Sequence, residues 1–291
     1  MHKTAIVTAS YVNDFERCRL LCESIDRHVM GDFIHYILVS GRDLALFRAL
    51  EGARRRIIDE RDLLPSWLVA LPDPTALMRR QVWLSPFSPP LRGWHVQQLR
   101  RMALARQIGE TAMLTVDSDV VLIRDFDPAT LWQGERLAFY RRPGAIDEDI
   151  RSDHLKWLKH SERLLGLPPA RLPATDYISS LIPWRTDTCR RLLDHIEARH
   201  GRHWVKAMIG TRAFSECIIY GRFVDEVLGG EGHVAMPQAL CHSLWFEDSY
   251  DRNLSGLRRF VADMAPNQIA LQIQSFIGHS IADIRAATAV V

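Results

Sequence analysis

The chain has 291 residues, of which 47% are hydrophobic and 25% charged, and these proportions exclude a disordered chain. Its 37 basic and 35 acidic residues leave a net charge of +2, which argues against a protein that binds nucleic acid. No apolar run is long enough to span a membrane, and we expect no secretory leader. The odd number of cysteines, five, favours a reducing compartment, so we expect a cytoplasmic protein.

The first part of the chain alternates short apolar runs with amphipathic segments. The residue pattern predicts strands at 4–9, 35–40 and 56–59, and helices at 15–28 and 43–50. Asp14 stands before the first of these helices, where its carboxylate is expected to cap the helix. Alternation with short links predicts an α/β fold of the Rossmann type, with a mixed, mainly parallel sheet flanked by helices.

Residues 64–93 interrupt this alternation with six prolines, and we expect a long irregular loop there. Arg79 and Arg80 lie close in sequence to Trp83 and Phe87. A basic and aromatic loop of this kind suits peripheral contact with an anionic membrane surface, at the inner face for a cytoplasmic protein.

The rest of the chain continues the α/β pattern without an internal repeat. A helix is expected at residues 93–109, with Trp94, Gln98 and Arg101 on one face. Further strands are expected at 113–116, 137–140, 177–183 and 233–236, and further helices at 153–166, 186–200 and 213–228. We therefore expect one domain over residues 1–291, built from two halves, 1–125 and 126–291. No pattern indicates an oligomeric state.

The motif Asp117-Ser118-Asp119 directly follows the apolar run 113–116 and is the sharpest chemical feature of the sequence. Ligands of open α/β sheets bind beyond the carboxyl ends of the strands. Two acids at such an edge favour a divalent cation, Mn²⁺ or Mg²⁺, which shares its coordination with the oxygens of a diphosphate. The ion would stabilise the charge on a departing nucleotide diphosphate. The plain alternative is that both acids only cap a turn.

Together, these features resemble the nucleotide-sugar-binding half of GT-A-fold glycosyltransferases. The resemblance rests on the first strand with its loop to Asp14, the helix that bears Trp, Gln and Arg, and the strand that ends in the two aspartates. More narrowly, an uncharacterised bacterial family of glycosyltransferase-like proteins has segments similar to Arg92-Gly93-Trp94, Tyr177-Ile178-Ser179-Ser180 and Phe214-Ser215-Glu216. The resemblance implies a nucleotide-diphosphate sugar donor bound by residues 1–125. It also implies a divalent metal and a saccharide or lipid-linked glycan acceptor on the side of residues 126–291.

Carried over by position, the resemblance assigns Asp119 as a direct metal ligand and Asp117 as a residue that holds the ribose or assists the metal. It implies a donor site that includes Thr8, Ser10, Tyr11, Asp43, Trp94, Gln98 and Ser118. Arg92 and Arg101 are expected to face the diphosphate, because guanidinium groups pair well with phosphate oxygens. Arg100 and Arg101 cannot both do so, since neighbouring residues point away from different sides of a helix.

The resemblance also implies a third metal ligand late in the chain, with His242 as the first candidate and His279 as the second. Glu216 is the expected general base of an inverting transfer, because its apolar surroundings favour burial and a raised pKa. It is equally placed to be a first-turn acid favoured by the helix dipole. Asp176 is an alternative acid on the acceptor side. The stereochemistry of transfer stays open.

Two other functions remain as alternatives. A haloacid-dehalogenase-type phosphatase would use Asp117 as nucleophile and Asp119 as acid and base, and the residues from Asp117 to Leu122 fit its motif. Against it, three strand-like segments precede the motif, and no later Gly-Asp pair supplies metal ligands. A nucleotide-sugar-binding protein without catalysis would keep the same fold. No glycine-rich loop follows the first strand, which disfavours nucleotidyl transfer and dinucleotide chemistry.

Overall fold

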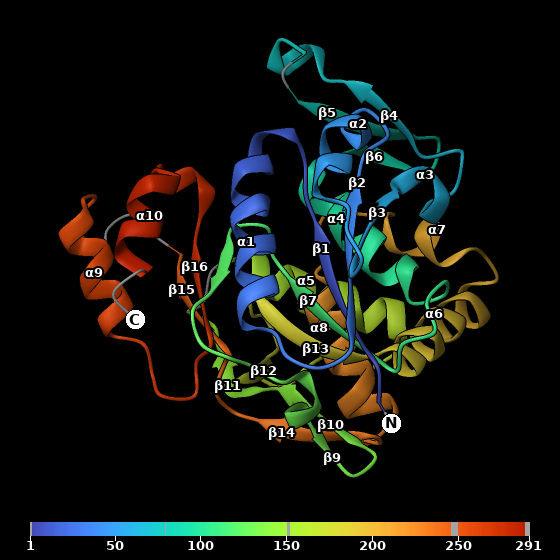
Figure 1. Ribbon diagram of the computed structural model, residues 1–291. Coiled ribbons are helices and arrows are strands. Elements are labelled where there is room, and N and C mark those ends of the chain that lie inside the picture. The colour runs from blue at the N-terminus through green and yellow to red at the C-terminus, as the bar shows by residue number, and fades with distance from the viewer. Residues whose placement is uncertain (1, 79, 150–151, 246–249, 289–291) are drawn as a thin grey trace.

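A five-stranded sheet with the strand order β3-β2-β1-β7-β13 forms the centre of the protein (Figure 1). The structure is a computed structural model that describes residues 2–78, 80–149, 152–245 and 250–288. Four strands run parallel, β1 (Thr4–Ala9), β2 (Phe33–Val39), β3 (Arg55–Asp59) and β7 (Ala112–Val116), and β13 (Leu181–Arg185) is antiparallel to β7. This topology confirms the predicted α/β class with a mainly parallel, Rossmann-like sheet.

Helices cover both faces of this sheet, and the alternation of side chains along β1 shows how. Ala5 and Val7 face a large apolar cluster that includes residues of α4 (Gly93–Leu104), α6 (Thr186–His200) and α8 (Glu216–Arg222). Ile6 points to the other face, where it packs with Leu21 of α1 (Phe15–His28). A strand with apolar residues on both sides is buried, as parallel strands between helical layers are.

Smaller elements extend this core. The remaining helices are α2 (Leu44–Phe47), α3 (Glu60–Leu63), α5 (Ser152–Leu165), α7 (Trp204–Met208), α9 (Leu254–Ala262) and α10 (Ile281–Thr288). Small sheets are formed by β8 (Val120–Leu122), β15 (Cys241–Leu244) and β16 (Ala270–Ile273), by β9 (Trp132–Gln133), β10 (Arg136–Tyr140) and β14 (His233–Met236), and by β11 (Arg142–Ile146) and β12 (Ala174–Asp176). Within the described residues, no helix is long and apolar enough to cross a membrane.

The prediction of an irregular loop at residues 64–93 is wrong. This segment forms an antiparallel sheet of β4 (Val69–Pro72), β5 (Gln81–Ser85) and β6 (Ser88–Leu91), which projects from the body (Figure 1). Prolines are compatible with this sheet because β4 and β6 are its edge strands, where a missing N–H breaks no ladder on the outer side. Arg79, one of the two arginines that the sequence singled out, lies outside the described residues.

Several other boundaries follow the predictions closely, and a few differ. The helix at 15–28 and the strand at 233–236 are confirmed residue for residue. The helix predicted at 93–109 ends at Leu104, and the strand predicted at 177–183 starts only at Leu181. Asp14 precedes α1 as expected, but its side chain makes no capping hydrogen bond. The carboxylate of Asp14 therefore does not serve as the helix cap.

Candidate functional site

The two aspartates of the motif lie at the carboxyl edge of the central sheet, beside the end of β1. Asp117 follows β7, and Tyr11 and Asp14 follow β1, which is the neighbour of β7 in the sheet. The chain proceeds from β1 to β2 and β3 on one side and then returns to β7 on the other side of β1. The strand order therefore reverses between β1 and β7, and the crevice at such a reversal is where open α/β sheets bind ligands.

Asp117 is held by the helix α4. The guanidinium of Arg101 donates from Nη2 to Asp117 Oδ1 and from Nη1 to Glu216 Oε1, the latter at 3.2 Å. Gln97 donates from Nε2 to Asp117 Oδ1 at 3.3 Å. Arg101 is buried and both of its terminal nitrogens are used. The expectation that Arg101 faces a diphosphate is therefore corrected, because this residue joins two carboxylates instead.

The second anchor of the aspartates is Gln272 on β16, which the sequence analysis missed. Its Nε2 donates to Asp117 Oδ2 at 3.2 Å and to Asp119 Oδ1 at 3.0 Å, and its Oε1 accepts from the Ser180 hydroxyl. The backbone N–H of Ser275 donates to Asp119 Oδ2 at 3.3 Å. A lone glutamine more than 150 residues away carries no sequence signal of this contact. Only the pairing of β16 with β8 brings it to the site.

Negative charge exceeds positive charge at this edge. Burial, together with the neighbouring carboxylates of Asp117 and Asp14, raises the pKa of Asp119 to about 7. Burial also raises the pKa of Asp14, although Arg17 and hydrogen bonding from serine hydroxyls oppose the shift. Arg17 donates to the backbone carbonyls of Ile273 and His279, and it forms no ion pair with a carboxylate of the described residues. A bound cation would relieve this excess.

The carboxylates fit a hard divalent ion that also takes ligands from a substrate. Among the described residues, no group of three or more His, Cys, Asp or Glu side chains is arranged to hold a metal by itself. Asp117 and Asp119 thus offer two carboxylates at one edge. Mg²⁺ is commonly bound by one or two carboxylates together with water and substrate phosphates, and Mn²⁺ prefers the same oxygen ligands.

The structure does not bring His242 to the aspartates, which corrects the expectation of a metal ligand there. The neighbouring Ser243 faces the site, since its hydroxyl lies 3.1 Å from that of Ser180. Adjacent residues of a strand point to opposite faces, so His242 points away. Its ring stacks on Phe260 of α9 with centroids 4.4 Å apart. The second candidate, His279, lies on the segment that starts at Ser275, and its carbonyl accepts from Arg17.

The donor residues expected near the end of β1 divide into surface and interior positions. Tyr11 is exposed at the strand end, and burial of its hydroxyl side together with Asp14 raises its pKa. Ser10 is buried, and its hydroxyl has no hydrogen-bond partner among the described residues. Thr8 lies in the interior, where its hydroxyl hydrogen-bonds to His35 at 3.0 Å. The structure therefore places the Thr8 side chain in a hydrogen bond within the sheet layer and not at the exposed strand end.

Two further donor residues, Asp43 and Gln98, have structural partners. Asp43 is buried after β2 and accepts a hydrogen bond from the Ser40 hydroxyl at 3.0 Å. Gln98 is also buried, and its Oε1 accepts from the backbone N–H of Glu216 at 2.9 Å. Gln98 therefore fixes the start of α8, and its neighbour Gln97 is the residue that reaches Asp117. Ser118 is buried between the two aspartates. Arg92 is exposed at the N-cap of α4.

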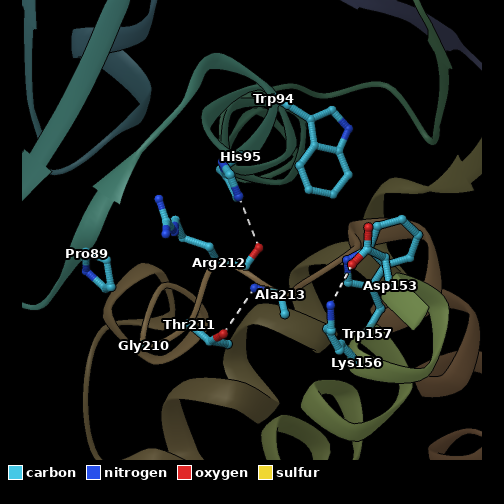
Figure 2. Close-up of a pocket in the computed structure, with 10 residues that line it drawn as sticks. All are labelled: Pro89, Trp94, His95, Asp153, Lys156, Trp157, Gly210, Thr211, Arg212 and Ala213. Atoms are coloured by element: carbon cyan, nitrogen blue, oxygen red, sulfur yellow. Dashed lines mark hydrogen bonds and ion pairs between the residues drawn. The ribbon is translucent and has the colours of Figure 1, made fainter. Parts of the chain in front are cut away.

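Trp94 lies in a pocket of about 520 Å³ between the two halves of the sequence (Figure 2). Figure 2 shows Trp94 and His95 on α4 facing α5 and the loop 210–213 across this space. The Trp94 and Trp157 rings have centroids 5.6 Å apart and are tilted by 32°. Lys156 pairs with Asp153 at 3.0 Å on the same wall. The pocket thus combines two indole rings with charged groups, as saccharide and cofactor sites do.

Both candidate catalytic acids have raised pKa values. Glu216 is the first residue of α8, and burial raises its pKa although Arg101 opposes the shift. Burial also raises the pKa of Asp176, whose Oδ2 is 4.0 Å from Nε2 of His154. The His154 ring is 4.8 Å from that of Trp157, which lines the pocket. The burial and raised pKa expected for Glu216 are therefore confirmed.

One buried thiol shows that these acids share a neighbourhood. Burial raises the pKa of Cys217 well above its ordinary value, and the charges of Glu216, Asp117 and Asp176 raise it further. Asp176 therefore lies within electrostatic range of the same thiol as the motif aspartate.

The chain belongs to a protein family described as a family of unknown function (DUF6492), which matches residues 4–286. No curated protein matches the sequence.

Proposed function

We propose that the protein is a metal-dependent glycosyltransferase that moves a sugar from a nucleotide-diphosphate donor to a saccharide or lipid-linked glycan. The observation that carries this proposal is the position of Asp117 and Asp119 at the strand-order reversal between β1 and β7, with an excess of negative charge. The resemblance of the motif and its flanking segments to GT-A-fold enzymes supports the same reading. The five free cysteines of the described structure support a cytoplasmic location.

In this proposal, the donor binds across the ends of β1 and β7. Asp117 and Asp119 hold Mn²⁺ or Mg²⁺, which when bound stabilises negative charge on the leaving nucleoside diphosphate. Arg101, Gln97 and Gln272 fix the orientation of the carboxylates before the donor arrives. Preorganised ligands of this kind reduce the cost of binding. The exposed ring of Tyr11 offers an aromatic surface for the nucleoside base.

The acceptor occupies the pocket of Trp94 and Trp157. By the helical rise, Trp94 is about 10 Å along α4 from Arg101, which places the pocket about two helical turns from the carboxylate edge. The flat, apolar faces of sugar rings suit contact with indole rings, which present a large apolar area. Trp94 is therefore assigned to the acceptor side, although the sequence resemblance implied a donor contact.

Glu216 is assigned as the base that accepts the proton of the acceptor hydroxyl. Its carboxylate shares the Arg101 guanidinium with Asp117, which keeps it near the leaving diphosphate. Burial raises the pKa of the Glu216 carboxyl toward neutral pH, and a general base is most effective when its pKa is near the working pH. Asp176 stands beside the aromatic wall and is assigned to acceptor binding.

The test is thermal melting of the protein with a panel of nucleoside diphosphates, each with and without Mn²⁺. A ligand at about 100 times its Kd adds about 2.7 kcal/mol, and each kcal/mol moves the Tm by roughly 2–4 °C at this size. We expect a Mn²⁺-dependent rise with one nucleotide, which Asp119→Asn abolishes. Asp194→Asn is the matched control, because Asp194 is exposed on α6 and pairs only with Arg106.

The outcomes separate the three functions. No rise with any nucleotide would overturn the proposal, and hydrolysis of free phosphoesters in that case would point to the phosphatase. A Mn²⁺-dependent rise without sugar transfer to any glycan acceptor would instead identify a nucleotide-sugar-binding protein.

A further inference from the structure

The hairpin of β4 and β5 exposes an apolar face to solvent. Val69 pairs with Leu84 and Leu71 with Val82, so these four side chains share one side of the sheet. Val69, Leu71 and Leu84 are 47%, 42% and 40% exposed. A sheet with one solvated face normally carries polar residues there. We call these four residues the hairpin face.

The opposite side of the same hairpin is already packed. Trp83 is buried beneath it, and its Nε1 donates to Glu60 Oε2 at 3.1 Å. Because the alternation of the strand places Trp83 and Leu84 on different sides, the outward direction of the hairpin face is firmly set. Its exposure is therefore not a consequence of a loosely attached strand.

The most exposed apolar side chains of the hairpin stand at its tip. Leu77 is 75% and Met78 56% exposed, and both residues have positive φ angles, 49° and 61°. Residues other than glycine in this conformation cost about 1–2 kcal/mol. The turn is stabilised by Asp73, whose side chain accepts hydrogen bonds from the backbone and hydroxyl of Thr75. Two large apolar residues at a strained, projecting turn indicate a function for the tip.

Basic residues outnumber acidic ones in the hairpin segment, and a further cation lies at its β5–β6 turn. Residues 64–92 contain three arginines and one aspartate, and the carboxylate of that aspartate is engaged in the turn. Arg80 is exposed next to the tip. Lys206 of α7 lies 3.8 Å from the centroid of the exposed Phe87 ring. Positive charge around apolar side chains is complementary to an anionic bilayer, in which the charges meet headgroups and the apolar groups enter below them.

The projecting shape favours a bilayer over a protein surface as the occupant. In Figure 1 the turn between β4 and β5 extends beyond the helices and the central sheet, so this tip can enter a soft surface before the body meets it. A protein partner would have to offer a groove for the tip. The charge of Arg80 also lies near enough to Tyr11 to oppose the rise in the Tyr11 pKa, so the hairpin and the carboxylate edge are on the same end of the protein.

We propose that the hairpin face, with Leu77 and Met78 at its tip, docks the protein on an anionic lipid surface. The inference deepens the proposed function, on which it rests in one respect: docking would present the donor edge to a lipid-linked acceptor. Binding to lipid itself does not depend on sugar transfer.

Flotation with lipid vesicles tests the proposal. Full-length protein should float with vesicles of phosphatidylcholine and phosphatidylglycerol, and not with phosphatidylcholine alone. The double variant Leu77→Ser and Met78→Ser should bind at least about tenfold more weakly, since two apolar side chains no longer enter the bilayer. The matched control is Leu46→Ser with Met30→Ser, which removes one exposed leucine and one exposed methionine from elsewhere. This control should float like the unmodified protein.

Three results would overturn the proposal. They are no flotation with anionic vesicles, equal flotation of the tip variant, and self-association in sedimentation that the tip variant abolishes. The last would assign the hairpin to a second copy of the chain. The Mn²⁺-dependent nucleotide response should be unchanged in the tip variant. If the unmodified protein floats with anionic vesicles but shows no Mn²⁺-dependent response to any nucleotide, the proposed transferase function would be rejected. The proposed lipid-docking surface would still be supported.

Discussion

Two adjacent arginines of α4 serve two different regions of the protein. Arg100 donates to Glu60 on the side of the hairpin, and Trp83 donates to the same carboxylate oxygen at 3.1 Å. Arg101 turns to the carboxylate edge, where it pairs with Asp117 and Glu216. Both guanidinium groups are buried. The separation agrees with the expectation that the two cannot point to one site.

The difference between these regions lies in the balance of charge. Beside the hairpin, the Arg100 guanidinium and the Trp83 indole N–H both bond to the Glu60 carboxylate. The charges are balanced there, so this group of residues has a structural role. At the sheet edge, Arg101 serves two carboxylates, and Asp119 and Asp14 stand nearby with raised pKa values. Buried acids without enough positive charge are costly to folding. Proteins keep such unfavourable groups of buried acids mainly at functional sites, where a bound cation or substrate supplies the missing positive charge.

The largest expected effect is on turnover at the carboxylate edge. Glu216→Gln keeps the shape of the side chain and removes its ability to accept a proton. Turnover should fall by about 10²–10⁴-fold, while nucleotide binding stays within a few-fold of the unmodified protein. Single-turnover kinetics with a saturating donor measure the first quantity and melting the second. Asp176→Asn should act mainly on the KM for the acceptor. Unmodified turnover in Glu216→Gln would reject its assignment as base.

The second prediction concerns the stability of the ion pair beside the hairpin, which Glu60→Gln removes. This change leaves the Arg100 guanidinium buried without its counter-charge, and removal of one partner from such a pair costs about 3–5 kcal/mol. Urea unfolding should show that loss in the free energy of unfolding. At urea concentrations below the unfolding midpoint of the variant, its Mn²⁺-dependent nucleotide binding should equal that of the unmodified protein. A loss under about 1 kcal/mol would contradict the claim that Glu60 and Arg100 form a buried, charge-balanced ion pair.

The smallest expected effect has the opposite sign. In metal-free protein, Asp119 has a pKa of about 7, whereas an unfolded aspartate has an ordinary pKa near 3.9. The folded state therefore binds more protons between these values, and stability falls as the pH rises through that window. Asp119→Asn should remove this fall and be more stable than the unmodified protein by about 1–3 kcal/mol above neutrality.

The stability gain is measured by urea unfolding in the presence of EDTA. Near pH 3 the two proteins should have similar free energies of unfolding, because Asp119 is then largely protonated in both the folded and the unfolded state. Equal stabilities above neutrality would contradict the excess of negative charge at the edge. Such a variant would gain stability and lose metal binding, as substitutions in strained sites often do.

Local patterns were sufficient for much of this protein and insufficient for its site. Helical periodicity predicted α1, and an apolar run with two acids predicted β7 and the place of Asp117. The role of Gln272 follows from strand pairing between distant segments, which no local window contains. The outward direction of His242 depends on the register of β15 for the same reason, since a shift of one residue reverses every side chain.

The hairpin shows a second limit of sequence patterns. Prolines in residues 64–93 indicated an irregular segment, because a proline has no N–H for a sheet ladder. The structure places these residues in a three-stranded sheet whose edge strands tolerate them. Whether a strand lies at an edge is a property of the whole fold, so the sequence could not decide it.

Calorimetric titration with Mn²⁺, alone and with the nucleoside diphosphate that raises the Tm, tests the central claim most directly. The account predicts that the unmodified protein and Glu60→Gln bind Mn²⁺ with similar affinity, and that Asp119→Asn loses at least about tenfold, or 1.4 kcal/mol. Equal Mn²⁺ affinity in the unmodified protein and Asp119→Asn would contradict the claim that the carboxylate edge is a cation site.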